Sequence, residues 1–325
     1  MSEPRICIVG AGGLSSSRIY PYIGTAGGQL VGACDLDAEK AKRNARMWGG
    51  KAYTDMETML DAERPDGVII CIGPGPHAEL APVVMRRGIP VYTEKPPATS
   101  AADALAVARV SRETGAGCTT AFKKRYAACY NRAHEWLDTF PPEKLHSLGI
   151  VYGSARYDNT DPRREFLLDF AIHAIDLVGY LFGDVEQVIA FTKDRHAYAV
   201  SLRFASGALG TMNMSDGRAW DVPTEEVEIT VEGGNFMTIH NSSTWRITQD
   251  GKTCEWREPP TFVSGGDSGG DTGHLAELVE FIEAVKTGGA TRSNIYESYK
   301  SMVLYEAIRD SAASGQIVNV AYEQC

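Results

Sequence analysis

Three ionisable side chains, Asp169, His173 and Asp176, lie four and three residues apart in the almost wholly apolar stretch 166–182. If this stretch is a helix, the spacing places all three on one face, where side chains a turn apart can meet. The surrounding Leu, Ile and Phe predict a helix that is buried on most sides. Burial and neighbouring charge shift pKa values, so an Asp and a His one turn apart could move a proton. The alternative is a structural role, in which the histidine is hydrogen-bonded in the core and an aspartate accepts hydrogen bonds from a loop.

A second pattern follows the predicted strand 6–9, which runs into Gly10-Ala11-Gly12-Gly13-Leu14-Ser15 at the start of a predicted helix. Gly10 allows a tight turn, and Gly12 lets the backbone approach a pyrophosphate, whose oxygens can bind free N–H groups at the helix start. Ser15 replaces the third glycine of the dinucleotide pattern with another small residue. An ordinary glycine turn is the alternative, but the strand and helix around the pattern favour nucleotide binding.

The next predicted strand, residues 30–34, ends at Asp35. A carboxylate at this place accepts hydrogen bonds from the hydroxyls of the adenine ribose and repels a 2′-phosphate. Leu36 and Asp37 follow where an NADP-binding protein commonly has Arg or Ser. The pattern therefore predicts NAD rather than NADP as the cofactor, although Asp35 could also cap the following helix.

A lysine lies in the run Glu94-Lys95-Pro96-Pro97, directly after the predicted strand 91–93. Ligands of doubly wound folds bind at this carboxyl edge of the sheet. Taken alone, Lys95 would be a solvated loop charge. Its position between a nucleotide-binding pattern and an acid–histidine helix favours a functional role instead.

The elements that must position these residues differ between the two halves of the chain. Up to residue 122, short β-branched runs alternate with helical stretches, which predicts a doubly wound parallel sheet of Rossmann type. The strands are expected at residues 6–9, 30–34, 68–72, 91–92 and 118–122. From about residue 145, longer alternating strands predict a mostly antiparallel open sheet with helices on one face.

We therefore expect an α/β NAD-binding domain at residues 1–122 and an α+β domain for substrate binding and oligomerisation at residues 123–325. The C-terminal helix and strand could pack back near the first domain. Because helices cover one face of the second sheet, its other face needs a partner, which predicts a homodimer or homotetramer through this sheet.

Composition narrows the choice of partner. The chain has 325 residues and a formal net charge of −10, and its basic residues are scattered, which argues against nucleic acid or a membrane as partner. Its seven cysteines form no CxxC pair, so we predict no metal site and reduced thiols. No apolar run reaches transmembrane length and no signal-peptide pattern is present. A cytoplasmic protein that binds a small molecule is expected.

Together these motifs resemble the Gfo/Idh/MocA family, the sugar and polyol oxidoreductases related to glucose-fructose oxidoreductase and inositol 2-dehydrogenase. The resemblance covers nearly the whole chain. It rests on Gly10 and Gly12, Asp35, Glu94-Lys95-Pro96, residues 122–126 and the D-x-x-x-H-x-x-D run that ends at Asp176. The Glu-Lys-Pro and Asp-His-Asp patterns, in this order, are much more specific than the glycines.

The resemblance implies a set of site residues. Its catalytic trio is Lys95, Asp169 and His173. Its cofactor-binding residues are Gly10, Gly12, Gly13, Leu14, Asp35, Ile72, Gly73, His77, Glu94 and Lys95, with Glu94 beside the nicotinamide. Its substrate-binding residues are Lys95, Arg125, Tyr126, Tyr157, Arg164, Asp169 and His173. The chain departs from the family at residues 72–74, where Thr-Pro-Asn is common, and at residues 158–165, where a glycine cluster is common.

The implied activity is hydride transfer between a secondary alcohol of a sugar or cyclic polyol and NAD. A neutral His173 could accept the hydroxyl proton while Asp169 orients the substrate and Lys95 polarises its oxygen. Lys95 could instead be the base. Two other functions stay open on the same fold, namely a redox-neutral glycosidase or lyase that acts by transient oxidation, and a non-catalytic NAD-responsive regulator.

Overall fold

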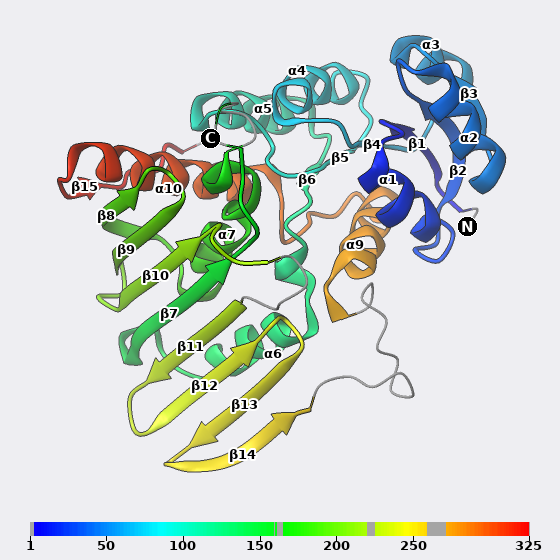
Figure 1. The fold of residues 1–325 in the computed structure, drawn as a ribbon. Helices are drawn as coiled ribbons and strands as arrows, with labels where there is room; N and C mark the ends of the chain where they lie inside the picture. The colour runs from blue at the N-terminus through cyan, green and yellow to red at the C-terminus, as the bar shows by residue number, and fades with distance from the viewer. Residues whose placement is uncertain (1–2, 159, 161–164, 220–224, 259–270, 325) are drawn as a thin grey trace. The chain divides into compact units, whose positions relative to one another are not determined.

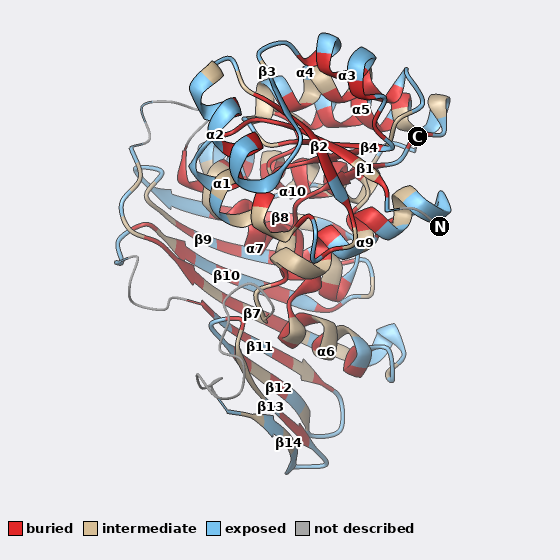
Figure 2. Cartoon of the chain, turned by 90° about the vertical axis from the view of Figure 1, so that its right-hand side faces the viewer, coloured by how far each residue is buried: buried red, intermediate tan, exposed pale blue. Residues whose placement is uncertain are grey.

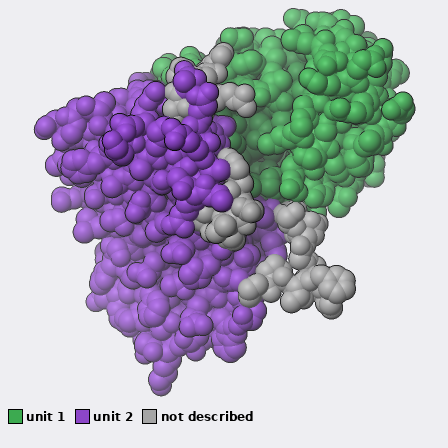
Figure 3. Space-filling view, viewed as in Figure 1, with its two compact units in different colours: residues 1–123, 273–299, 325 green, residues 124–272, 300–324 purple. Residues whose placement is uncertain are grey.

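A computed structural model describes residues 3–158, 160, 165–219, 225–258 and 271–324. The chain divides into two compact units, coloured separately in Figure 3. It passes from the first unit to the second after Lys123, returns to the first at Gly273, and leaves it again after Tyr299. The first unit therefore contains a segment from late in the sequence, and each unit is described by itself below.

In the described residues, the first unit contains a six-stranded sheet in the order β3-β2-β1-β4-β5-β6, and every neighbouring pair is parallel. The strands are β1 (Arg5–Val9), β2 (Gln29–Cys34), β3 (Lys51–Tyr53), β4 (Gly67–Ile70), β5 (Val91–Thr93) and β6 (Cys118–Thr120). The predicted doubly wound sheet is confirmed. Strand β3 is absent from the sequence-based prediction because it is short and its residues are exposed or only partly buried.

Helices cover both faces of this sheet (Figure 1). They are α1 (Gly13–Arg18), α2 (Ala38–Trp48), α3 (Met56–Glu63), α4 (Pro74–Met85), α5 (Ala101–Thr114) and α9 (His274–Thr287). Met59 and Val84 belong to the core on one face, whereas Leu278 and Phe281 of α9 belong to the core on the other. Strands β1 and β4 of this sheet are coloured mostly as buried in Figure 2, as a sheet covered on both faces requires.

The second unit is built on a sheet in the order β14-β13-β12-β11-β7-β10-β9-β8-β15. Its strands are β7 (Leu145–Gly153), β8 (Val185–Lys193), β9 (Ala197–Phe204), β10 (Leu209–Ser215), β11 (Glu225–Val231), β12 (Asn235–His240), β13 (Thr244–Gln249), β14 (Lys252–Arg257) and β15 (Val318–Asn319). Among these described strands, β7 and β10 pair in parallel and the other pairs are antiparallel. The predicted mostly antiparallel sheet is therefore confirmed.

Helices cover one face of this second sheet. They are α6 (Ala128–Leu137), α7 (Ile172–Phe182) and α10 (Ile295–Ser314), which continues into this unit from Lys300 onward. Alternate residues of β9 are buried, and the ring of Phe204 lies 5.2 Å from that of Phe182 on α7. Because the residues between them are exposed, this strand has one covered face and one open face.

The apolar stretch 166–182 is not the single α-helix that its spacing predicts. It begins with a π-helical turn, Phe166–Phe170, and continues as α7 after Ala171. The amide of Ala171 donates to the carbonyl of Phe166 at 2.9 Å, a wider turn than that of an α-helix. The expectation of heavy burial is confirmed, since α7 is buried from Ile172 to Val178.

Asp176 anchors this helix in the core. Its side chain is 0% exposed and accepts hydrogen bonds from Arg125 at 2.8 and 2.9 Å and from the Ser301 hydroxyl at 2.7 Å. Breaking a buried ion pair of this kind typically costs about 3–5 kcal/mol, because the remaining charge stays buried without its counter-ion. Asp176 therefore holds α7 against α10 and the turn Lys123–Tyr126.

Across the described ranges, none of the helices combines the length and apolar character that crossing a lipid bilayer would require.

Candidate functional site

The glycine turn after β1 has the backbone that the sequence predicts for dinucleotide binding. Gly10 has φ +103°, and a Cβ there would clash with the carbonyl oxygen of Cys71. Around Gly12 and Gly13, by contrast, no heavy atom of the described residues, apart from the adjacent chain itself, lies within 4 Å of the position a Cβ would take. Ser15 is buried beneath the turn and donates to the Gly12 carbonyl at 3.2 Å. Only glycine fits at the tight position, and the outer side of the turn has room for a pyrophosphate.

Asp35 lies at the carboxyl end of β2 and is bonded to this turn. Its Oδ2 accepts the amide of Ala11 at 2.7 Å, and its Oδ1 accepts the amide of Asp37 at 2.9 Å. The N-cap of α2 is Asp37, which accepts the amide of Glu39 at 3.0 Å. Asp35 is therefore not the helix cap that the sequence allows, and its carboxylate lies beside the glycine turn, where a ribose is expected.

Exposed apolar side chains lie close to the carboxyl ends of three neighbouring strands. Leu14 follows β1, Leu36 follows β2 and Ile72 follows β4, and they are 45%, 95% and 48% exposed. Large apolar residues exposed at a ligand-binding edge suit the flat faces of an aromatic ring. Leu36 is missing from the sequence-based set, although a leucine between two aspartates in a predicted loop was an available signal.

His77 on α4 connects two loops at this edge. Its side chain is buried; Nδ1 lies 2.9 Å from the Pro96 carbonyl, and Nε2 accepts the amide of Ile72 at 3.2 Å. Desolvation lowers the pKa of His77 from 6.5 to about 4, and the nearby charge of Lys95 acts in the same direction. The ring is therefore neutral near pH 7, with its proton on Nδ1. It holds the loop after β4 against the loop that carries Lys95.

Glu94 and Lys95 leave the carboxyl end of β5. The Glu94 amide continues the sheet by donating to the Ile70 carbonyl at 2.9 Å, and its carboxylate accepts the Lys95 amide at 3.2 Å. Lys95 is half-buried, and the Lys95–Pro96 peptide is cis. The first unit thus holds Lys95 at the same sheet edge as the glycine turn and Asp35.

In the second unit, Asp169 and His173 lie on either side of the junction between the π turn and α7. Asp169 is half-buried, and its Oδ2 accepts the Tyr157 hydroxyl at 3.1 Å. The ring of Tyr157 packs against Phe166 and Phe170, with centroids 6.0 and 6.2 Å apart. His173 is 7% exposed. The structure thus joins Tyr157 to the predicted acid–histidine pair through Asp169.

Two other predicted substrate residues are buried. Arg125 binds Asp176, as described above, and the side chain of Tyr126 is 2% exposed. The neighbouring Lys124 is also buried and pairs with Glu225. No signal in the sequence links these partners, which are far apart along the chain. Arg164, the remaining predicted substrate residue, lies outside the described residues.

The chain matches two family models. Residues 4–122 match the oxidoreductase family with an NAD-binding Rossmann fold, and residues 158–320 match the C-terminal alpha/beta domain of the same Gfo/Idh/MocA family.

Individual relatives cover nearly the whole chain. The 4-carboxy-2-hydroxymuconate-6-semialdehyde dehydrogenase of Sphingobium sp. is 26% identical over 90% of this chain and 93% of its own length. The D-apiose dehydrogenase of Paraburkholderia graminis is 23% identical over 96% and 88%. An oxidoreductase from Agrobacterium radiobacter, solved with NAD+, L-tartaric acid and magnesium, superimposes with a TM-score of 0.85 at 18% identity, covering 98% of each chain. This last likeness shows the fold.

The neutral state of His77 predicts a pH dependence of stability. Between pH 6.5 and about 4 the unfolded chain binds a proton that the folded chain does not, so acidification across this range destabilises the protein through His77. Relative to His77→Asn, the wild type should lose about 3 kcal/mol of unfolding free energy between pH 7 and pH 4. Urea denaturation at several pH values measures this difference. His146→Asn, at an exposed position, is the control. A wild type and His77→Asn that respond identically to pH would contradict the assignment.

Proposed function

The chain belongs to the Gfo/Idh/MocA family of NAD-binding oxidoreductases, and on that premise we propose that it is a dehydrogenase for a secondary alcohol of a sugar or cyclic polyol. One observation carries the proposal: the chain has both Lys95, fixed at the cofactor-binding edge, and the Asp169–His173 pair at a π turn of the second unit. Two relatives named as dehydrogenases, one of D-apiose, support the reaction class.

The two units have different roles in this proposal. The first holds NAD through the glycine turn and Asp35, and the second supplies substrate-binding groups and the oligomer surface. When bound, NAD supplies the hydride acceptor. A cytoplasmic location completes the proposal and rests on the sequence alone.

His173 accepts the hydroxyl proton of the substrate in this mechanism. Asp169 orients that hydroxyl, and Tyr157 fixes the Asp169 carboxylate by donating to it. The ammonium group of Lys95 stabilises negative charge that develops on the same substrate oxygen. Lys95 as the base is the other assignment that these residues allow. A panel of sugars, inositols, sugar acids and carboxylated aldehydes, screened for NADH formation, identifies the substrate.

Loss of the proposed catalytic groups should reduce turnover and leave NAD binding intact. Lys95→Ala and His173→Ala should each lower kcat by at least about a hundredfold, because positioned proton transfer and charge stabilisation supply effects of this size. Asp169→Asn should act similarly, with some loss of substrate binding. Steady-state kinetics and NAD titration measure both properties, with the exposed Lys252→Ala as the control. Near-normal turnover in a folded Lys95 or His173 variant that still binds NAD would place the chemistry elsewhere.

Asp35 should make the protein bind NAD more tightly than NADP, because its carboxylate repels a 2′-phosphate. Asp35→Ser should narrow the ratio of the two dissociation constants. Asp37→Asn removes a charge two residues away and retains a good helix cap, so it should leave the ratio nearly unchanged. Titration with each cofactor measures the ratio. Equal or tighter binding of NADP by the wild type would contradict this role of Asp35.

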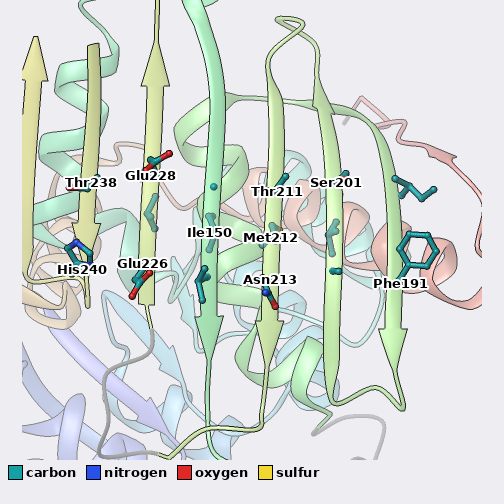
Figure 4. A pocket seen from close by; sticks show the side chains of 16 residues that line it. Ile150, Phe191, Ser201, Thr211, Met212, Asn213, Glu226, Glu228, Thr238 and His240 are labelled. Atoms are coloured by element: carbon teal, nitrogen blue, oxygen red, sulfur yellow. The ribbon is translucent and has the colours of Figure 1, made fainter. Parts of the chain in front are cut away.

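The open face of the second sheet is the proposed contact with a second copy. Its strands form a shallow hollow of about 530 Å³ whose lining mixes apolar and polar side chains (Figure 4). Phe191 is 63% exposed there. The same face carries Glu226 and Glu228 on β11 and, to either side, Arg203 on β9 and Arg246 on β13. A face that has both signs of charge can be complementary to its own two-fold copy.

Light scattering should therefore show a dimer or tetramer at micromolar concentration. Phe191→Glu should shift the protein toward a monomer, because it places a charge on an exposed apolar part of the proposed contact. Met47→Glu changes an equally exposed residue of the first unit and should leave the assembly intact. A wild-type protein that stays a 35.3 kDa monomer in solution would contradict the proposed oligomer.

A further inference from the structure

The tip of the β8–β9 hairpin reaches two carboxylates of the second unit. Asp194 and Arg195 adopt positive φ angles of 53° and 61°, so the chain turns sharply just before His196. His196 Nδ1 lies 2.7 Å from Asp216 Oδ2, and a guanidinium nitrogen of Arg195 lies 3.5 Å from Glu165. Since Glu165 immediately precedes the π turn that carries Asp169, the hairpin tip touches the surroundings of a proposed catalytic group.

Asp216 connects His196 to the backbone of Tyr157. It follows β10 and is 2% exposed, and the Oδ2 atom that faces His196 also accepts the Tyr157 amide at 2.9 Å. The Asp216 amide donates back to the His196 carbonyl at 3.0 Å. Because Asp216 is bonded to both His196 and the Tyr157 amide, it fixes the backbone of Tyr157 relative to the hairpin.

Tyr157 in turn reaches Asp169, whose Oδ2 accepts its hydroxyl at 3.1 Å. Residues 196, 216, 157 and 169 therefore form a continuous chain of hydrogen bonds. A second path runs from the same hairpin through Glu165. Its carboxylate accepts the Tyr305 hydroxyl at 2.9 Å, and its carbonyl accepts the Asp169 amide at 2.8 Å. The hairpin is thus connected to both the side chain and the backbone of Asp169.

We propose that His196 and Asp216 are positioning residues, which hold Tyr157 so that its hydroxyl orients the Asp169 carboxylate for the reaction. This inference rests on the proposed function, in which Asp169 contacts the substrate. The His196 side chain is 30% exposed, and partly exposed pairs of this kind contribute little stability. The His196–Asp216 contact would instead act by positioning Tyr157, since a displacement of about 1 Å at a reacting group can lower the rate a hundredfold.

The first experiment measures hydrogen exchange at the Tyr157 amide in the full-length protein without substrate. His196→Ala and Asp216→Asn should both accelerate its exchange at least about tenfold, because each weakens the acceptor for that amide. His134→Ala is the matched control, since His134 forms a similar pair with Asp138, at 3.2 Å, on the unrelated helix α6. Unchanged exchange in both network variants would overturn the inference.

The second experiment measures turnover with a substrate from the panel. His196→Ala and Tyr157→Phe should each lower kcat by about tenfold with an unchanged KM for NAD, and the double variant should be no slower than the worse single variant. His196→Asn retains an N–H donor and should recover most of the activity. Effects that multiply in the double variant, or equal losses in His196→Asn and His196→Ala, would overturn the inference.

The two experiments separate the inference from the proposed function. If no compound of the panel is oxidised, the proposed function fails, and the exchange measurement alone decides whether His196 and Asp216 hold Tyr157. If turnover is found and the Asp169 variant is inactive, normal kcat in His196→Ala and Asp216→Asn contradicts the positioning role while the proposed function stands.

Discussion

The pairing of Asp176 with Arg125 is the interaction on which the second unit depends. A carboxylate that is fully withdrawn from water must find an opposite charge and hydrogen-bond donors. Arg125 and Ser301 provide them from two segments far apart in the sequence. This requirement fixes the orientation of α7 in the core and therefore the position of the π turn at its start. Asp169 and His173 lie at that junction, so the Asp176–Arg125 pair positions the proposed catalytic groups.

In the first unit, a buried neutral residue, His77, has the corresponding role. His77 is buried without charge, and its two ring nitrogens hold the loops that carry Ile72 and Pro96. A charged imidazole could not accept the Ile72 amide, because both of its nitrogens would be donors. Lys95 is thereby held by a group whose own titration is suppressed near neutral pH. In both units, buried polar residues supply the geometry that the proposed catalytic groups need.

Local patterns in the sequence predicted the layers of the fold and the residues at strand ends. Gly10 and Asp35 follow apolar strands at fixed offsets, so their place at the sheet edge could be foreseen. The π turn could not be predicted, since it inserts one extra residue into a helical pattern that is almost wholly apolar. Nor could the partners of Tyr157, because Asp216 follows it by 59 residues and comes close only through the order of strands β7 and β10. Long-range pairing of this kind leaves no periodicity in the sequence.

Net hydride transfer from a carbinol carbon to NAD is tested most directly by isotope tracing. The substrate is labelled with deuterium at the carbon that bears the reacting hydroxyl, and the products are analysed by NMR. If NAD accepts the hydride, the released reduced nicotinamide should carry one deuterium and a ketone should replace the alcohol, with a primary isotope effect if the transfer limits the rate. Product that forms while the deuterium stays on the sugar, without accumulation of NADH, would contradict it and indicate redox-neutral chemistry instead.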